Sequence, residues 1–121
     1  MRIQESGENY LETILILHRR SGGAVRSIDI ASELNVTKPS VSRAMGILRE
    51  DGYINMEKGG VITLTEKGME VAQGVYERHT VITNFLTNVL KVSPEIADRD
   101  ACRIEHIISS ETFEQMKNYA K

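Results

Sequence analysis

The apolar residues in the first 50 positions recur at the spacing of amphipathic helices. Apolar side chains return every three or four residues in three segments, 8–20, 27–34 and 38–50. Ser27 and Thr37 precede or open the second and third segments, and a hydroxyl there can accept from a free amide of the first turn. The side chains expected to face a core are Leu11, Ile14, Leu15, Leu17, Ile28, Ala31, Leu34, Val41, Met45, Ile47 and Leu48.

Strand-like sequence follows the third segment. Residues 53–57 and 61–64 flank Lys58-Gly59-Gly60, and paired glycines suit the positive φ angles of a tight hairpin turn. Three short helices followed by a hairpin form the pattern of a helix-turn-helix with a wing. Residues 1–64 are therefore predicted to form a winged helix-turn-helix domain.

The second half of the chain reads as helical throughout. Thr65 is predicted to cap a long helix that continues to Leu90, about 40 Å at ~1.5 Å per residue. Ser93-Pro94 and Ser110 then open two further helices, ending near 109 and 119. The apolar faces comprise Ala72, Val75, Ile82, Leu86, Val89, Ile96, Ala101, Ile104 and Ile108, with His79 interrupting the first of them. The expected fold class is mainly α, with residues 65–121 forming a helical domain.

Composition narrows the possible environments and activities. The chain has 121 residues, a net charge of -2, a single cysteine and no apolar run near the ~20 residues of a membrane span. These features predict a cytoplasmic protein with no membrane partner and no disulfide. Residues 36–49 carry three basic side chains and no acidic ones, so a local basic helix could attract phosphates despite the overall charge.

Three side chains with metal-ligand chemistry share one helix face. Cys102, Glu105 and His106 stand at i, i+3 and i+4, so a thiolate, a carboxylate and an imidazole converge there. The ordinary alternative is a buried thiol beside a solvated Glu–His pair. Taken alone, His79 is more often a core histidine and Glu12 the rim of an amphipathic helix. Three helices that each offer a ligand type favour a metal site.

Several runs resemble one known family. Asp100-Ala101-Cys102-Arg103-Ile104-Glu105-His106 and Tyr76-Glu77-Arg78-His79 look like the metal-site signature of the diphtheria-toxin-repressor and manganese-transport-regulator family. Asn9-Tyr10-Leu11-Glu12-Thr13-Ile14 is similar to its first helix, residues 36–43 to its recognition helix, and Leu64-Thr65-Glu66-Lys67-Gly68 to its wing exit. The resemblance covers essentially the whole chain and implies a DNA-binding repressor that metal activates.

The resemblance also implies a ligand set. Cys102, Glu105, His106 and His79 would bind the metal, Glu12 would add a carboxylate, and Asn9 stands where the manganese branch has an aspartate. Thr83 and Asp98 occupy positions where the iron branch has further ligands. The expected metal is Fe(II) or Mn(II), and Zn(II) or Co(II) would substitute in vitro. The soft thiolate favours Fe(II), Co(II) or Zn(II) over Mn(II). Glu12 and the short architecture, without an SH3-like C-terminal domain, favour Mn(II) instead.

The resemblance and the basic segment together predict a DNA-reading surface. The recognition helix would enter the major groove and read bases, with Arg43 suited to guanine. The residues expected at bases are Thr37, Pro39, Ser40, Ser42 and Arg43, and those expected at phosphates are Arg26, Ser27, Lys38 and Lys58. The expected partners are a palindromic double-stranded operator and a second copy of the chain, which would pair through the side bearing Ile104, Ile107 and Ile108 and parts of the first helix.

A mechanism follows as a hypothesis: metal joins the first helix to the long helix and the Cys-Glu-His helix, and thereby spaces two recognition helices near one DNA turn, ~34 Å. The hypothesis requires the imidazole of His79 to lie near the sulfur of Cys102.

One alternative is a winged-helix regulator that senses a small organic ligand. An enzyme with Cys102 as nucleophile and His106 as base is disfavoured, because the pair has no orienting group or oxyanion site. A purely structural dimerisation module is disfavoured by the composition of residues 36–49.

Overall fold

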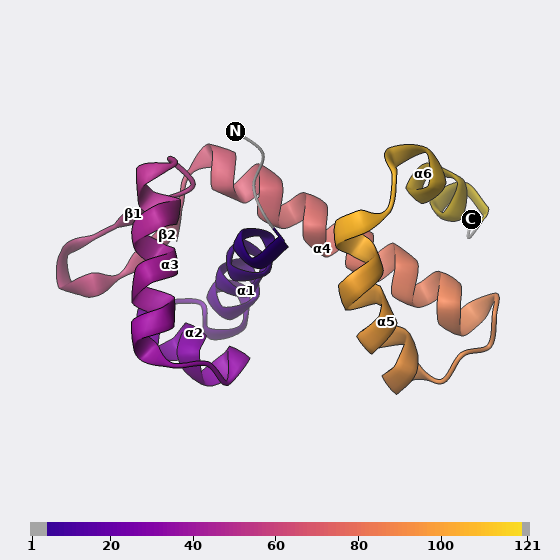
Figure 1. Ribbon diagram of the computed structural model, residues 1–121, viewed down its shortest axis with the longest axis horizontal. Coiled ribbons are helices and arrows are strands. Elements are labelled where there is room, and N and C mark those ends of the chain that lie inside the picture. The colour runs from indigo at the N-terminus through magenta and orange to yellow at the C-terminus, as the bar shows by residue number, and fades with distance from the viewer. Residues whose placement is uncertain (1–4, 120–121) are drawn as a thin grey trace. The chain divides into compact units, whose positions relative to one another are not determined.

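The computed structural model describes residues 5–119. Its elements, in chain order, are α1 (Glu5–Ser21), α2 (Ser27–Leu34), α3 (Lys38–Glu50), β1 (Ile54–Met56), the short 3-10 helix η1 (Lys58–Gly60), β2 (Ile62–Leu64), α4 (Glu66–Asn88), α5 (Pro94–Ile107) and α6 (Ser110–Tyr119) (Figure 1). The chain divides into two compact units, which meet between Gln73 and Gly74 inside α4. The mainly helical fold with an N-terminal winged helix-turn-helix confirms the expected fold class.

The first unit is a three-helix core closed by the hairpin. Its buried residues come mainly from α1, α2, α3, both strands and the start of α4, and those fully or almost fully buried include Leu11, Ile14, Leu15, Val25, Ile30, Val41, Met45, Ile54, Ile62 and Ala72. Two of the expected core residues point outward instead, because Ile28 is 59% exposed and Ile47 is 55% exposed. On α2, Ile30, two residues later, takes the buried position, and on α3 the adjacent Leu48 does so. Each residue turns the side-chain direction on a helix by about 100°, so a shift of one or two positions suffices to move a side chain off the core.

A side-chain cap sets the start of α3. Thr37 is its N-cap, since its Oγ1 accepts a hydrogen bond from the amide of Ser40 at 3.3 Å, as expected. Before it, α2 ends at Asn35, whose left-handed φ of 55° turns the chain toward α3. The predicted cap of α2 is one residue off: α2 begins at Ser27, and the capping position belongs to Arg26, whose amide donates to the Asp29 carboxylate at 2.9 Å.

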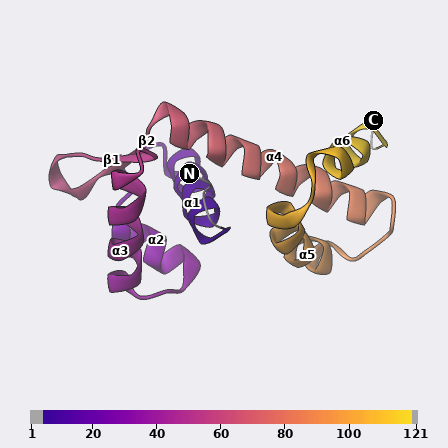
Figure 2. The same cartoon turned by 45° about the horizontal axis from the view of Figure 1, so that its top comes forward.

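The hairpin forms the wing. Strands β1 and β2 are antiparallel, with Asn55 opposite Thr63, and Figures 1 and 2 show their connecting turn projecting away from the helices of this unit. Gly59 and Gly60 have φ angles of 83° and 80°, which explains why glycines occupy the turn. The amide of Ile62 also donates to the carbonyl of Val25 at 2.7 Å, so the segment before α2 pairs with the wing.

The second unit packs the C-terminal part of α4 with α5 and α6. Its buried cluster is Ile82, Leu86, Ala97 and Ala101, flanked by Phe85, Val92, Ile104, Ile108 and Met116. The rings of Phe85 and Tyr119 meet edge to face at 5.9 Å between centroids and join α6 to α4. Within residues 5–119, no helix has the length and apolarity to cross a membrane.

Three details of this unit correct the sequence expectations. Helix α4 ends at Asn88 rather than at Leu90, and Val89 is 37% exposed. On α5, Ile96 is 43% exposed, whereas its neighbour Ala97 is fully buried because a small side chain fits the close packing of the two helices. The cap of α6 is Ser109 rather than Ser110, since its Oγ accepts from the amide of Thr112 at 3.1 Å.

Candidate metal centre and DNA-binding surface

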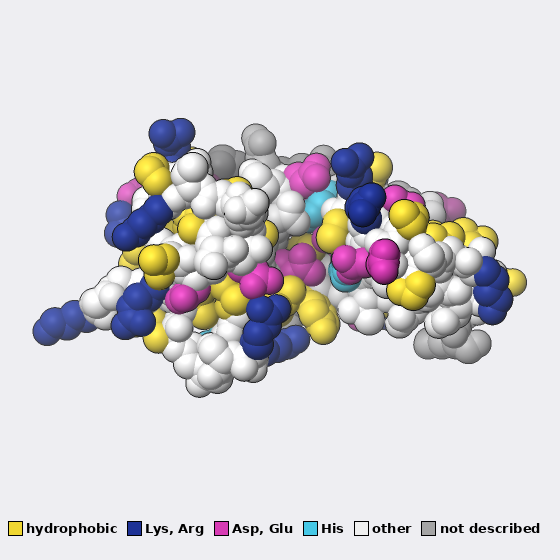
Figure 3. Space-filling model, turned by 90° about the horizontal axis from the view of Figure 1, so that it is seen from below, with side chains coloured by type: hydrophobic (Ala, Val, Ile, Leu, Met, Phe, Trp, Pro, Cys, Tyr) yellow, Lys and Arg dark blue, Asp and Glu magenta, His cyan; other side chains and the backbone are white. Residues whose placement is uncertain are grey.

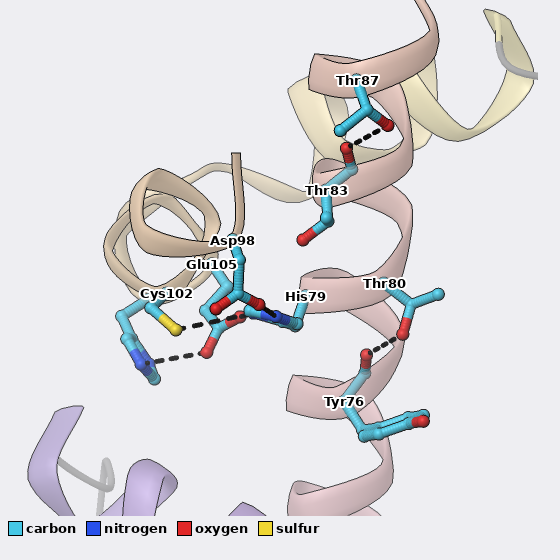
Figure 4. Close-up of polar contacts among 9 residues, drawn as sticks. Tyr76, His79, Thr80, Thr83, Thr87, Asp98, Cys102 and Glu105 are labelled. Carbon is cyan, nitrogen blue, oxygen red and sulfur yellow. Dashed lines mark hydrogen bonds and ion pairs between the residues drawn. The ribbon is translucent and has the colours of Figure 1, made fainter. Parts of the chain in front are cut away.

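Helices α4 and α5 lie close enough for their polar side chains to meet. Ala97 and Ala101 present almost no side-chain bulk where α5 faces Ile82 and Leu86 of α4. The guanidinium Nε of Arg78 also donates to the backbone carbonyl of Glu105 at 2.8 Å. This packing brings His79 of α4 into the face of α5 that carries Asp98, Cys102 and Glu105 (Figure 4).

Glu105 is a buried carboxylate between two imidazoles. Its side chain has no exposed surface, and its Oε2 lies 2.8 Å from Nδ1 of His79. Its other oxygen, Oε1, lies 3.3 Å from Nε2 of His106, whose side chain is only 1% exposed. That oxygen makes no hydrogen bond to any other group in residues 5–119. A buried carboxylate with an unsatisfied oxygen is costly unless a cation compensates it.

His79 faces acidic groups through both ring nitrogens. Its Nε2 lies 2.8 Å from Oδ1 of Asp98, and its Nδ1 lies 3.8 Å from the sulfur of Cys102 as well as near Glu105. A neutral imidazole has a single N–H, so it cannot donate to carboxylates on both sides at once. The close approach of His79 to Cys102 meets the geometric requirement of the sensor hypothesis.

The donor atoms around His79 fit a divalent transition metal. The ligand atoms of His79, Asp98 and Cys102 all lie within 4.8 Å of one another, and Glu105 adds the unsatisfied oxygen described above. Imidazole, thiolate and carboxylate together suit borderline metals such as Fe(II), Co(II) and Zn(II), and the carboxylates also suit Mn(II). A positive ion here would offset the buried charge of Glu105 and satisfy its orphan oxygen.

The burial of these residues is the opposite of what the alternative interpretation of the sequence expects, namely a buried thiol beside a solvated Glu–His pair. Cys102 is exposed rather than buried, and Glu105 and the imidazole of His106 are buried rather than solvated. Asp98 was not included in the expected ligand set, although the resemblance places it where the iron branch has a further ligand. A second signal was its position one helical turn before Cys102, which places both on one face of α5. The hydroxyl of Thr83, one turn after His79, is buried without a hydrogen bond in the described residues.

Glu12 and Asn9 lie on α1, in the first unit. Both are half-buried, and each makes polar interactions. Their neighbours Leu11 and Ile14 are fully buried in the core of that unit, so the core holds this part of α1 firmly.

The residues expected to bind DNA surround α3 and the wing. Thr37, Lys38, Pro39, Ser40, Ser42 and Arg43 are all exposed, as are Arg26 and Lys58, whereas Ser27 is half-buried. Figure 3 shows Lys and Arg side chains projecting from the tip of the wing and from the neighbouring surface of the same unit. Such a surface can contact the phosphates of a duplex.

Some of these side chains also have structural roles. The Nε of Arg26 donates to the carbonyl of Gly59 at 3.2 Å and so links the start of α2 to the wing turn. The hydroxyl of Thr37 donates to Oγ of Ser40 at 2.8 Å while capping α3. Lys38, Ser42 and Arg43 have exposed side chains on α3.

Two family models together match almost the whole chain. Residues 2–61 match the iron-dependent repressor N-terminal DNA-binding domain. Residues 65–121 match the iron-dependent repressor metal-binding and dimerisation domain. The boundary between the two matches coincides with the end of the wing.

Individual relatives agree with this assignment. The transcriptional regulator MntR of Escherichia coli O157:H7 is 40% identical over 114 residues, which cover 94% of this chain and 72% of that protein. An uncharacterised HTH-type transcriptional regulator of Methanocaldococcus jannaschii is 33% identical over 115 residues, covering 95% of this chain and 92% of that protein.

A solved structure extends the likeness to three dimensions. The structure of the manganese regulator SloR superimposes with a TM-score of 0.83 at 27% identity and covers 98% of this chain. The chain spans about half of that structure's length, 54%. From the two domain matches, the relatives and the fold, the chain belongs to the iron-dependent repressor family of metal-dependent transcriptional repressors.

Proposed function

We propose that this protein represses transcription by binding a palindromic operator as a homodimer when Fe(II) or Mn(II) occupies the cluster around His79 and Glu105. The observation that carries the proposal is the buried Glu105 carboxylate, which lies between two imidazoles and has one oxygen without a hydrogen bond in the described residues. Such an arrangement is poorly balanced without a cation and well balanced with one.

The proposed ligands come from α4 and α5, with a contribution from α1. Cys102, Glu105, His106 and His79 form the core of the set, and Asp98 joins them because of its contact with His79. Glu12 adds a carboxylate from the first unit, and Asn9 a weaker neutral oxygen. A bound divalent cation supplies the positive charge that this group of acidic and neutral donors lacks.

The chain's own residues would convert that charge into DNA affinity. Arg78 already holds α5 to α4 through the carbonyl of Glu105, so His79 and Glu105 keep their relative orientation. Glu12 is the residue that would couple the cluster to the DNA-binding unit, because α1 packs into the same core as α3. The effect on DNA is limited by how much more tightly the competent state holds the metal.

The relatives and the donor chemistry support different metals of the proposed pair, Fe(II) and Mn(II). SloR is described as a manganese regulator, which supports Mn(II). The Cys102 thiolate is a soft donor and supports Fe(II) over Mn(II), while Zn(II) and Co(II) would bind in vitro.

Lys38, Pro39, Ser40, Ser42 and Arg43 would contact DNA, and the chain would act in the cytoplasm, where its operator lies.

The test combines metal binding and DNA binding in one preparation. Anaerobic protein is titrated with Fe(II), Mn(II) or Zn(II), and the bound metal and the affinity for an operator selected from random duplexes are measured together. Wild-type protein should bind the operator at least ten-fold more tightly with its metal. The Cys102→Ala/His106→Ala double variant should remain folded and lose that difference.

The control is His18→Ala. His18 is an exposed histidine near the C-terminal end of α1, where it contacts the carbonyl of Gly23. It should keep both metal content and metal-dependent affinity. Operator binding that is equally tight with and without metal would contradict the proposal and favour a regulator of the organic-ligand type.

A further inference from the structure

Beyond Arg43, the outer face of α3 carries two residues that are not part of the hydrophobic core, Gly46 and Ile47. Gly46 lies in the middle of the helix and Ile47 follows it. The side chain of Ile47 is 55% exposed, although the sequence pattern assigned it to the core. Arg43 and Ile47 are one turn apart, so they share one face of the helix, with Gly46 beside them.

Gly46 has no role within its own unit that would require a glycine. A Cβ placed there meets no atom within 4 Å, and its φ is not positive. A glycine in the middle of a helix lowers helix stability relative to alanine. No atom of residues 5–119 prevents alanine at this position. Because Gly46 also shares an exposed helix face with Arg43, the glycine leaves room for a partner to approach α3 there.

Ile47 points to the chemistry of what approaches. An isoleucine has a lower helix propensity than alanine, leucine or the long charged and amide residues, and it gains little from burial here, since more than half of it is exposed. It stands beside Arg43 on a helix that carries no acidic residue in its first turn. A basic and apolar helix face of this kind is complementary to the major groove, which offers phosphates, base edges and the methyl groups of thymine.

We propose that Gly46 and Ile47 extend the DNA-reading surface of α3: the helix approaches the duplex closely at Gly46, and Ile47 packs on a thymine methyl. The inference rests on the proposed function, because it requires α3 to enter the major groove. Four residues advance a helix by about 6 Å, and base pairs are spaced by about 3.4 Å. The operator should therefore contain an A·T pair about two base pairs from the base that Arg43 reads, once in each half-site.

The experiment begins with operators selected by the wild-type protein from a library of random duplexes in the presence of Mn(II). Each conserved thymine is then replaced by deoxyuridine, which lacks only the 5-methyl group. At one position per half-site, the wild type should lose affinity by about four-fold, the effect of burying one methyl group. Ile47→Ala should bind the thymine operator more weakly and show no further loss on deoxyuridine.

Gly46→Ala tests the close approach. It should raise the thermal midpoint by roughly 2–4 °C and weaken operator binding on the order of ten-fold, because the added methyl meets the duplex. Gly74→Ala is the matched control, since Gly74 is also inside a helix with no atom within 4 Å of its Cβ position. It should raise the midpoint similarly and leave operator affinity within two-fold.

The outcomes separate this inference from the function on which it rests. If the wild type selects no sequence, the proposed function fails and this inference with it. If it selects a sequence but binds equally well without metal, only the metal dependence fails, and the deoxyuridine and Gly46→Ala measurements still decide the role of Gly46 and Ile47. If binding is metal-dependent and sequence-specific, but Ile47→Ala retains the deoxyuridine effect and Gly46→Ala binds normally, only the role of Gly46 and Ile47 is overturned.

Discussion

The imidazole of His79 and the carboxylate of Glu105 lie 2.8 Å apart, although 26 positions separate them in the chain. His79 is one fifth exposed and Glu105 is fully buried. The contact joins α4 to α5 at the point where Asp98 and Cys102 also approach. This pair is therefore the structural centre of the candidate metal site, and the first prediction concerns it.

Glu105→Gln should separate the charge of this residue from its shape. Without metal, the variant should be as stable as the wild type or more stable, because the desolvation cost of a buried carboxylate that is not compensated is removed while the volume is kept. Metal at a concentration of 100 times its dissociation constant should stabilise the wild type by about 2.7 kcal/mol, and the variant by much less. Thermal denaturation with and without Mn(II) measures both effects, and chelation should return the wild type to its metal-free midpoint. A variant stabilised as much as the wild type would remove Glu105 from the ligand set.

Asp98→Asn should weaken metal binding without unfolding the protein. The Asp98 side chain is 65% exposed, and its contact is with Nε2 of His79. Loss of its charge should reduce Mn(II) affinity by about ten-fold, in the range seen when groups that support a metal site are removed. Equilibrium dialysis gives the affinity. Asp100→Asn is the control, since Asp100 is an exposed aspartate on the same helix. An equal loss in both variants would indicate a general charge effect instead of ligation.

Gly68→Ala should destabilise the first unit because the added carbon has no room. A Cβ at this position would overlap the carbonyl oxygen of Tyr53 and lie 3.0 Å from its carbonyl carbon. Both are backbone atoms, so relief requires movement of α4 or of the chain at Tyr53, just before β1, and the expected loss is about 1–3 kcal/mol. Gly74→Ala, on the same helix, has open space and should be neutral or stabilising. Urea denaturation of the two variants provides the comparison, and similar midpoints would contradict the packing described here.

Thr37 should show a capping role distinct from any contact with DNA. Thr37→Ala should cost about 1 kcal/mol of stability, because the first turn of α3 loses its acceptor. Thr37→Asn should preserve most of the stability, since asparagine also caps helices. If both variants bind the selected operator like the wild type at a temperature where they are folded, Thr37 serves only the helix. A loss of affinity in Thr37→Asn would add a role at the DNA.

Ile107→Glu should disrupt the proposed homodimer. Ile107, at the end of α5, is 78% exposed and does not belong to the buried apolar cluster of the second unit. An exposed apolar side chain of this size is typical of an interface. Sedimentation equilibrium should show a dimer for the wild type and a monomer for the variant. Ile96→Glu is a matched change at the other end of α5, where the side chain is 43% exposed. A variant Ile107→Glu that remains dimeric would place the interface elsewhere.

Much of the fold was predictable because local patterns decide it. The helical spacing of apolar residues located α2 at Ser27–Leu34, and the hydroxyl of Thr37 located the start of α3. Gly59 and Gly60 located the turn of the wing through their positive φ angles. Each of these features depends on neighbours within a few residues. The errors, such as Ile47 and Ile96 facing solvent, arose where two adjacent apolar residues competed for one buried position.

The candidate site was predictable only in part. The spacing of Cys102, Glu105 and His106 on one helix face follows from the sequence alone, since it needs only the geometry of a helix. The burial of Glu105 and the exposure of Cys102 do not, because they depend on which face of α5 meets α4. Asp98 likewise enters the cluster only through the position of His79 on another helix.

The order of residues by itself determined the helices, the wing, the basic segment around α3 and the types of ligand on α5. Only the tertiary structure decided that Glu105 loses its water, that one of its oxygens is left without a hydrogen bond in the described residues, and that Asp98 faces His79. The physical reason is that helix periodicity and capping are short-range effects. Desolvation and the meeting of side chains from different helices depend on how those helices pack.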